Sequence, residues 1–105
     1  MRQTSSSTIG CIEHAASVLG SKWTGQIIRE LALGPKRFCE LERALPALNP
    51  RTLSKRLDEL SHQQIIVANG QPRGYSLTKK GSDLLPVLHE MVAWGTKHSR
   101  PPADT

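Results

Sequence analysis

Apolar and polar positions between residues 50 and 63 recur with the period of an amphipathic helix. Asn49 is a favourable N-cap, and a proline follows at the first helical position, where its missing N–H donor is not needed. Arg51 and Lys55 lie on the side of the helix opposite a stripe of leucines. The leucines recur at steps of four and three residues, at Leu53, Leu57 and Leu60. The pattern predicts a helix with a buried apolar face and an exposed basic face.

Two further helices are predicted near the start of the chain. Apolar residues at helical spacing occupy residues 11–19, after which a glycine and a serine end the segment. Ser21 is the expected N-cap of a second helix, which Gly34 and Pro35 stop. Gly25 lies inside this second helix and costs up to about 1 kcal/mol relative to alanine. It therefore predicts either a close approach of another segment or a weak helix.

A helix-turn-helix pair and a hairpin follow along the chain. The third helix covers residues 38–44, and a short turn joins it to residues 50–63, with Leu48 filling the corner. The β-branched residues 65–68 and the alternating residues 75–77 predict two strands around an Asn-Gly turn. The predicted fold class is therefore mainly α with a small β-hairpin, arranged as a winged helix-turn-helix.

The last predicted helix has more apolar surface than one buried stripe requires. Thr78 is its expected N-cap, and Pro86 kinks or divides it near Leu84 or Leu85. Its apolar side chains are Leu84, Leu85, Val87, Leu88, Met91, Val92 and Trp94. A single inward stripe would use only part of this set, so the helix has apolar surface to spare.

Length and charge limit the function of the chain. With 105 residues, it is long enough for one domain with a core of modest size. We expect this domain at residues 9–98, between flexible ends at residues 1–8 and 99–105. The formal net charge of +5 favours a polyanionic partner. Because the sequence has neither an apolar run of membrane-spanning length nor the apolar core of a secretory signal, we expect a cytoplasmic location.

Residues along most of the chain match the pattern of a known family. They are Cys11, Gly20, Lys22-Trp23, residues 34–38, Leu41, Leu53, Arg56-Leu57, Leu60, residues 75–78, Gly81, Leu84, Val87-Leu88 and Trp94-Gly95. This pattern, which spans residues 11–95, resembles the HxlR-type transcriptional regulators, relatives of the MarR group. The resemblance implies a bacterial DNA-binding regulator that occupies a near-palindromic operator as a homodimer. The wing is shorter than is usual in that family, because only residues 69–73 separate the two strands.

The resemblance also implies a dimer joined through the first and last helices. This arrangement accounts for the spare apolar surface of the last helix. The expected interface residues are Ile12, Leu84, Leu88, Met91, Val92 and Trp94. Residues 50–63 of each copy would form the recognition helices, which enter successive major grooves about one helical turn apart.

Basic and hydroxyl side chains of the recognition helix are candidate DNA contacts. Arg51, Thr52 and Lys55 are expected at base edges. Arginine and lysine can bond guanine O6 and N7, and threonine can contact a thymine methyl. Ser54 and Arg56 lie on the flanks of the same face and are expected at phosphates.

Three basic residues outside that helix extend the candidate surface. Lys36 and Arg37 precede the third helix and are expected to clamp phosphate with help from the helix N-terminus. Arg73 in the short wing is expected at the minor groove or its phosphates. The same basic face and hairpin would also suit a winged-helix module that binds another protein, and this alternative stays open.

Two cysteines are too few for a disulfide scaffold. In a number of regulators of the family that the chain resembles, a cysteine at the place of Cys11 senses oxidants or electrophiles, which requires an exposed, reactive thiol. Glu13 disfavours a thiolate nearby, so the favoured interpretation of Cys11 is a buried structural thiol. Cys39 lies in the third predicted helix and is expected to pack in the core of the domain.

Other chemistry has little support in the sequence. Trp23 and Trp94 are expected in the core or at the dimer interface, where a groove that they line would admit a small apolar effector. Cys11 and His14 have a spacing that suits a shared metal, but two ligands without further partners do not make a site. We expect no cofactor, and no carboxylate pair, nucleophile motif or glycine-rich phosphate loop indicates an enzyme.

Overall fold

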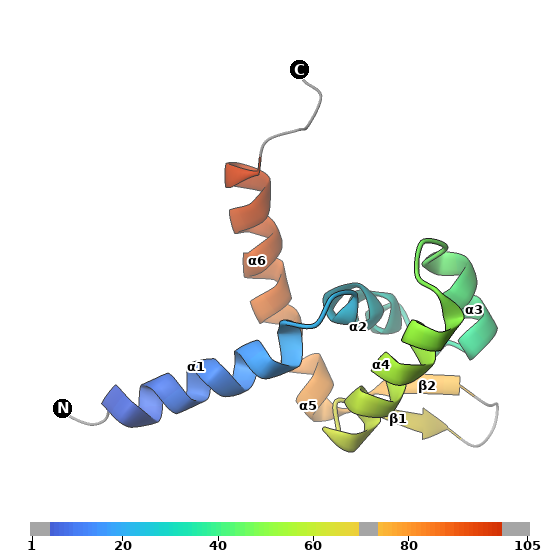
Figure 1. Cartoon of the computed structure of the whole chain (residues 1–105), viewed down its shortest axis with the longest axis horizontal. Coiled ribbons are helices and arrows are strands. Elements are labelled where there is room, and N and C mark those ends of the chain that lie inside the picture. Colours follow the sequence, from blue (N-terminus) through green and yellow to red (C-terminus); the bar gives the residue numbers. More distant parts are fainter. Residues whose placement is uncertain (1–4, 70–73, 100–105) are drawn as a thin grey trace.

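The structure, a computed structural model, describes residues 5–69 and 74–99. The elements follow in the order α1 (Ser5–Leu19), α2 (Thr24–Ala32), α3 (Phe38–Ala44), α4 (Pro50–His62), β1 (Ile66–Asn69), β2 (Gly74–Leu77), α5 (Lys79–Ser82) and α6 (Leu85–His98). Figure 1 shows α2 to α5 and the two strands gathered into one unit, which we call the body. Helices α1 and α6 project from the body in different directions, and we call them the arms.

Helix α4 confirms the helix predicted around residues 50–63. Its N-cap is Asn49, whose Oδ1 accepts hydrogen bonds from the backbone N–H groups of Arg51 at 2.9 Å and Thr52 at 3.1 Å. The helix ends at His62, and Gln63 is its C-cap. Its buried face consists of Leu53, Leu57 and Leu60. The cap satisfies two of the donors that the first turn leaves unpaired, so α4 begins at a fixed point.

The core of the body lies between α2, α3, α4 and the hairpin. Its most deeply buried side chains are Ile27, Ile28, Leu41, Leu53, Leu57, Leu60, Ile65 and Ile66. Leu48 is buried in the corner between α3 and α4, as predicted. Each arm adds one buried residue to this core, Val18 from α1 and Leu88 from α6. The body therefore encloses the apolar face of α4 and most of its other large apolar side chains within a single chain.

The prediction that Ser21 caps α2 is wrong. The helix begins at Thr24, and Trp23 occupies the N-cap position with φ 80° and no side-chain capping bond. Ser21 contributes only its carbonyl oxygen, which accepts a hydrogen bond from the Thr24 N–H at 3.3 Å. The short turn between α1 and α2 passes through the left-handed region at Trp23. A positive φ at a bulky residue is rare and strained, so no helical pattern predicts it.

Gly25 lies where α2 meets the arm α6. A Cβ atom at this position would stand 3.4 Å from Leu88 Cδ2. Of the two explanations that the sequence allowed for this glycine, the close approach of another segment is the one that the structure shows.

The wing is an antiparallel hairpin, as predicted, with Ile66 opposite Leu77. A third segment, which no sequence pattern predicts, also pairs with the hairpin. Lys36 and Tyr75 exchange two backbone hydrogen bonds of 3.0 and 2.8 Å. A Cβ atom at Gly74 would come within 2.9 Å of the Lys36 carbonyl oxygen, so the glycine allows this approach. A bridge of one residue has no alternating pattern, and sequence reasoning could not find it.

The last predicted helix is divided as expected, whereas the first helix begins earlier than predicted. The predicted division near Leu84 or Leu85 is confirmed, since α5 ends at Ser82 and α6 begins at Leu85. The Thr78 Oγ1 accepts a hydrogen bond from the Gly81 N–H at 3.0 Å, so it caps the short α5. Helix α1 begins at Ser5 instead of near residue 11, and Gly10 lies inside the helix without ending it. None of the described helices is long and apolar enough to cross a membrane.

Candidate nucleic-acid interface

The exposed face of α4 carries the predicted base-contacting residues. The side chains of Arg51 and Lys55 are exposed, and Thr52 is partly buried beside them. Within the described residues, neither cation forms an ion pair or a side-chain hydrogen bond. Ser54 is also exposed on this helix. Free cations on a capped helix are available to phosphates and to base edges.

Arg56, which was predicted to contact phosphate, has two partners within the chain. Its Nε donates a hydrogen bond to the Lys22 carbonyl oxygen at 3.1 Å, and its guanidinium also meets the Glu59 carboxylate at 3.1 Å. Only 19% of its side chain is exposed. Arg56 therefore fastens α4 to the turn between α1 and α2. The Arg-Glu spacing of three residues in the sequence indicated the second contact, but the Lys22 carbonyl could be found only from the fold.

The predicted phosphate clamp before α3 is only partly available. Arg37 is the N-cap of α3 and its side chain is exposed, but its backbone N–H donates to the Glu40 carboxylate at 2.8 Å. That carboxylate takes the place that a phosphate would need at this donor, so the expected help from the helix N-terminus is not present there. Lys36 is half-buried and its backbone is paired with Tyr75. Arg73 lies outside the described residues.

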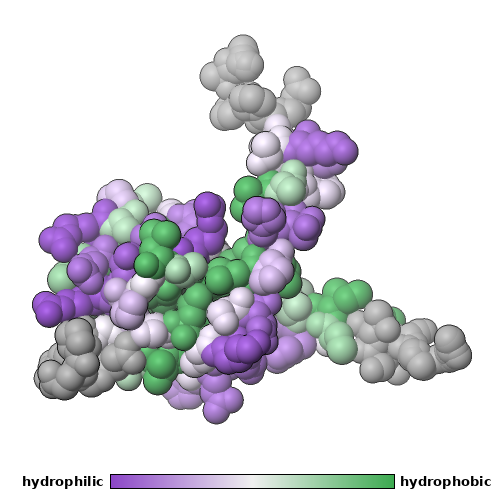
Figure 2. All heavy atoms as spheres, turned by 180° about the vertical axis from the view of Figure 1, so that it is seen from behind, coloured by the Kyte–Doolittle hydropathy of each residue, from purple (hydrophilic) through white to green (hydrophobic). Residues whose placement is uncertain are grey.

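Most of the exposed large apolar side chains lie on the two arms. Among the side chains that the structure describes, six of the eight exposed large apolar ones lie on α1 or α6: Ile9, Ile12, Val87, Met91, Val92 and Trp94. Figure 2 shows hydrophobic residues along both projecting helices and at their base. Of the six predicted interface residues, Leu88 is instead buried in the chain's own core, and Leu84 is packed against that core. The reason is that Leu88 faces Gly25 of α2.

The two tryptophans occupy different environments. Trp23 packs partly against the core, with the Lys22 Nζ 5.3 Å from its ring centroid. Trp94 is 68% exposed on α6, and its ring lies 4.8 Å from that of His98. A groove of about 770 Å³ runs between α2 and α6, but neither tryptophan lines it. The tryptophan-lined groove that was predicted for an apolar effector is therefore not this one.

Both cysteines are exposed, which corrects the prediction that they are buried. Cys11 lies in α1, one of the two arms. Cys39 is two positions before Leu41, the residue that α3 buries, and this spacing turns it to the opposite side of the helix. In the part of the chain that the structure describes, no three His, Cys, Asp or Glu side chains gather where they could hold a metal ion.

A capped recognition helix, a preceding helix joined to it by a short turn, and a two-stranded wing define a winged helix-turn-helix protein. The HxlR-like helix-turn-helix family matches residues 18–102. The chain belongs to this family and is a transcription regulator with a helix-turn-helix DNA-binding fold.

Similar proteins include a regulator from Bacillus subtilis. The HTH-type transcriptional regulator YodB of that organism is 38% identical over 95 residues, which cover 86% of this chain and 85% of YodB. The structure of quinone-bound YodB matches with a TM-score of 0.75 and 40% identity, over 82% of this chain and 94% of that one. The redox regulator HypR in its reduced form matches with a TM-score of 0.73 and 33% identity, over 82% and 90% of the two chains.

Proposed function

We propose that the protein binds a near-palindromic operator as a homodimer, with α4 of each copy in a major groove. The observation that carries this proposal is the pair of exposed cations on α4, Arg51 and Lys55, opposite the buried leucines of the same helix. Because Asn49 fixes the first turn, both side chains project from a rigid support. A basic face on a rigid helix meets the geometric needs of direct base recognition.

The contacts are divided by their position on the fold. Arg51, Thr52 and Lys55 lie toward the N-terminal part of α4 and reach base edges. Ser54 and the exposed side chain of Arg37 hold phosphates on either side. Lys36, whose backbone pairs with β2, adds charge to the backbone contacts, and Arg73, which follows β1 in the sequence, is proposed to do the same. Arg56 supports this surface indirectly by holding α4 against Lys22.

The second part of the proposal is a dimer formed by the arms. Ile12 on α1 is 63% exposed, and Met91 and Val92 on α6 are 50% and 45% exposed. Exposed apolar side chains gathered on two projecting helices are typical of a surface that a partner covers. A second copy of the chain supplies the same two helices, so the contact is self-complementary.

Fluorescence anisotropy on labelled DNA tests this function. Operator fragments are first selected from random duplexes with the purified protein, and affinity is then measured over a range of salt concentrations. We expect binding to weaken steeply with salt, because bound cations release counterions from DNA. Arg51→Ala should cost about 1–3 kcal/mol on the selected operator and less on random duplex.

Lys97→Ala is the control for charge. It removes one positive charge from the far end of α6, which Figure 1 shows projecting away from α4. This variant should retain the preference for the operator. The proposal fails if the wild type binds no duplex at low salt, and a winged-helix module that binds a protein partner would then replace it.

The exposed thiol of Cys11 favours an oxidant or electrophile as the signal. One solved relative is quinone-bound, and another is described as a redox regulator. In this proposal, the Cys11 sulfur adds to a ring carbon of a quinone. The thiol proton goes to one quinone oxygen, and the hydrogen on the attacked ring carbon moves as a proton to the other oxygen when the ring becomes aromatic, which leaves a hydroquinone joined to sulfur. The reaction needs an accessible thiol and no other oxidant.

Operator binding before and after treatment with 1,4-benzoquinone tests the signal. The treated wild type should gain the mass of one quinone at Cys11 and change its affinity for the operator. Cys11→Ser should show neither effect, whereas Cys39→Ser, which removes the other exposed thiol, should respond as the wild type does. An equal response from the wild type and Cys11→Ser would reject this role.

A further inference from the structure

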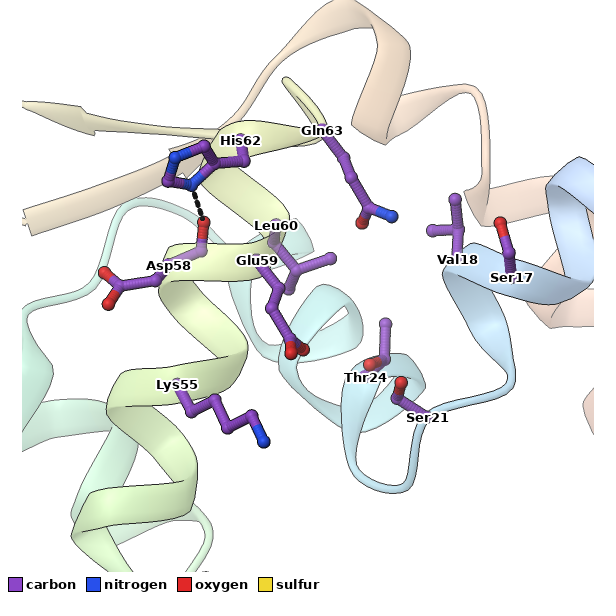
Figure 3. A pocket seen from close by; sticks show the side chains of 10 residues that line it. All are labelled: Ser17, Val18, Ser21, Thr24, Lys55, Asp58, Glu59, Leu60, His62 and Gln63. Carbon is purple, nitrogen blue, oxygen red and sulfur yellow. Dashed lines mark hydrogen bonds between the residues drawn. The ribbon is translucent and has the colours of Figure 1, made fainter.

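A cavity of about 540 Å³ lies between the end of α1, the start of α2 and the flank of α4. Figure 3 shows side chains of all three segments around it, including Val18 of α1, Thr24 of α2 and Lys55 of α4. The volume is within the range of sites for small organic molecules. Lys55 lines this cavity and is also a proposed DNA contact, so an occupant would touch the DNA-binding surface directly.

The wall contributed by α2 contains a buried hydroxyl group without a partner. Thr24 is only 2% exposed, and its Oγ1 makes no hydrogen bond to any other residue that the structure describes. A buried hydroxyl in this state is destabilising, because it has given up its hydrogen bonds to water without gaining another partner. Ser21 and Gln63 line the same cavity with a further hydroxyl and an amide. These groups would hydrogen-bond to a hydroxyl or carbonyl oxygen of a ligand.

The charges around the cavity favour an anionic ligand. Figure 3 shows the Lys55 side chain extended toward the segment that holds Ser21 and Thr24, whereas the Asp58 carboxylate points the other way. The Glu59 carboxylate faces the cavity, but its charge is matched by Arg56 at 3.1 Å. The ammonium of Lys55 is therefore the charge left for a ligand, and a carboxylate would pair with it.

Apolar side chains complete the walls. Val18 and Leu60 line the cavity, and both are buried in the core. They offer a surface for the hydrocarbon part of a ligand, which favours a ring or a short branched chain over a small inorganic anion.

We propose that this cavity binds a small organic monocarboxylate that carries a hydroxyl group, and that binding lowers the affinity for operator DNA. The carboxylate pairs with Lys55, the ligand hydroxyl bonds to Thr24, and the hydrocarbon part rests on Val18. Lys55 cannot reach DNA while it holds the ligand. The second half of the proposal rests on the proposed function, whereas the first half concerns ligand binding alone.

Isothermal titration calorimetry of the full chain without DNA tests the site. The probes are 4-hydroxybenzoate and 2-hydroxyisocaproate, with 4-hydroxybenzamide as the uncharged counterpart of the first. At least one carboxylate should bind saturably, and the amide should bind more weakly. Thr24→Val and Lys55→Met should each weaken binding about tenfold, which is the usual effect of losing one hydrogen bond or charged contact.

Lys79→Met is the control for Lys55→Met. Lys79 is an exposed lysine on α5 that pairs with Asp83 and does not line the cavity. Its removal should leave ligand affinity unchanged, and circular dichroism should show that all three variants are folded. The site is rejected if neither carboxylate binds at millimolar concentration. It is also rejected if Thr24→Val and Lys55→Met bind as tightly as the wild type.

Anisotropy with the selected operator then tests the regulation. The bound carboxylate should lower the operator affinity of the wild type about tenfold or more, and Thr24→Val should bind the operator normally but respond to the ligand much less. If the ligand binds by calorimetry and leaves operator affinity unchanged, regulation from this site is disproved. If the wild type does not bind DNA at all, the proposed function fails, whereas calorimetry still decides the site.

Discussion

The body and the arms differ in how far they bury their apolar side chains. In the body, Leu53, Leu57 and Leu60 of α4 are at most 2% exposed, because α2, α3 and the hairpin cover them. In the arms, Ile12 and Trp94 are more than 60% exposed within one chain. The body can therefore close its core alone, whereas the arms need a partner to bury theirs.

This difference indicates how the two functions of the chain are joined. Each arm is anchored in the body by a buried side chain, Val18 of α1 and Leu88 of α6, and Arg56 of α4 also bonds to the Lys22 carbonyl in the turn after α1. These contacts hold the base of each arm against helices of the body. Pairing of the arms would thus set the distance between the two copies of α4, and with it the spacing of the operator half-sites.

The largest effect is expected from Leu57→Ala in the body. Removal of a fully buried leucine side chain typically costs about 2–5 kcal/mol. A domain of this size has only about 5–15 kcal/mol of stability, so this variant should unfold at a clearly lower urea concentration. Ser54→Ala, on the exposed side of the same helix, should change stability by less than about 0.5 kcal/mol. Equal unfolding midpoints for both variants would refute the assignment of the core.

Trp94→Glu in α6 should separate the copies without unfolding the body. A charge at the centre of an apolar interface should weaken the dimer by about 2 kcal/mol or more, which is roughly thirtyfold in the dissociation constant. Sedimentation velocity measures the effect, and circular dichroism verifies the fold. Val67→Glu places the same charge on an exposed apolar residue of β1 and should not alter dimerisation. If Trp94→Glu remained dimeric and Val67→Glu became monomeric, the interface would lie on the wing instead of on the arms.

Asn49→Ala should destabilise the body by about 1 kcal/mol, because an N-cap that accepts two backbone hydrogen bonds is lost. Operator affinity should fall with it, since the first turn of α4 carries Arg51. Asn49→Asp keeps an accepting oxygen and should retain most of the stability. Thermal unfolding of the three proteins checks the order, and an Asn49→Asp variant as weak as Asn49→Ala would exclude capping as the cause.

The smallest effect is expected from Gly25→Ala at the joint between body and arm. The added Cβ would meet Leu88 at an ordinary contact distance of 3.4 Å. The gain in helix propensity, up to about 1 kcal/mol, should therefore be retained, and the variant should be equally or slightly more stable. Gly81→Ala is the contrast, because its Cβ would collide with the Ile65 carbonyl and should lower the melting temperature. A large loss of stability in Gly25→Ala would show that the joint tolerates no added atom.

Much of the body could be predicted from the sequence, because its signals are local. Leucine spacing, the Asn-Pro start of α4 and the division before Pro86 each depend on neighbouring residues, and the structure has these features at the predicted places. The exposure of Arg51 and Lys55 followed from the same helical period.

Features that depend on contacts between distant segments could not be predicted from the sequence. The positive φ of Trp23, the Lys36–Tyr75 bridge and the Arg56 contact with Lys22 arise only when separate segments meet. The sequence pattern also predicts a buried Cys11 and an interface position for Leu88, whereas Cys11 is exposed and Leu88 is buried in the chain's own core. Apolar character alone does not tell which residues face the chain's own core and which face outward on a projecting helix.

Hydroxyl-radical footprinting of the selected operator, with the number of bound chains measured by sedimentation, tests the central claim most directly. Two chains should bind each duplex, and the two protected segments should be centred about one helical turn apart, roughly 10 base pairs. A single chain per operator, or one protected segment without two-fold symmetry, would contradict the account.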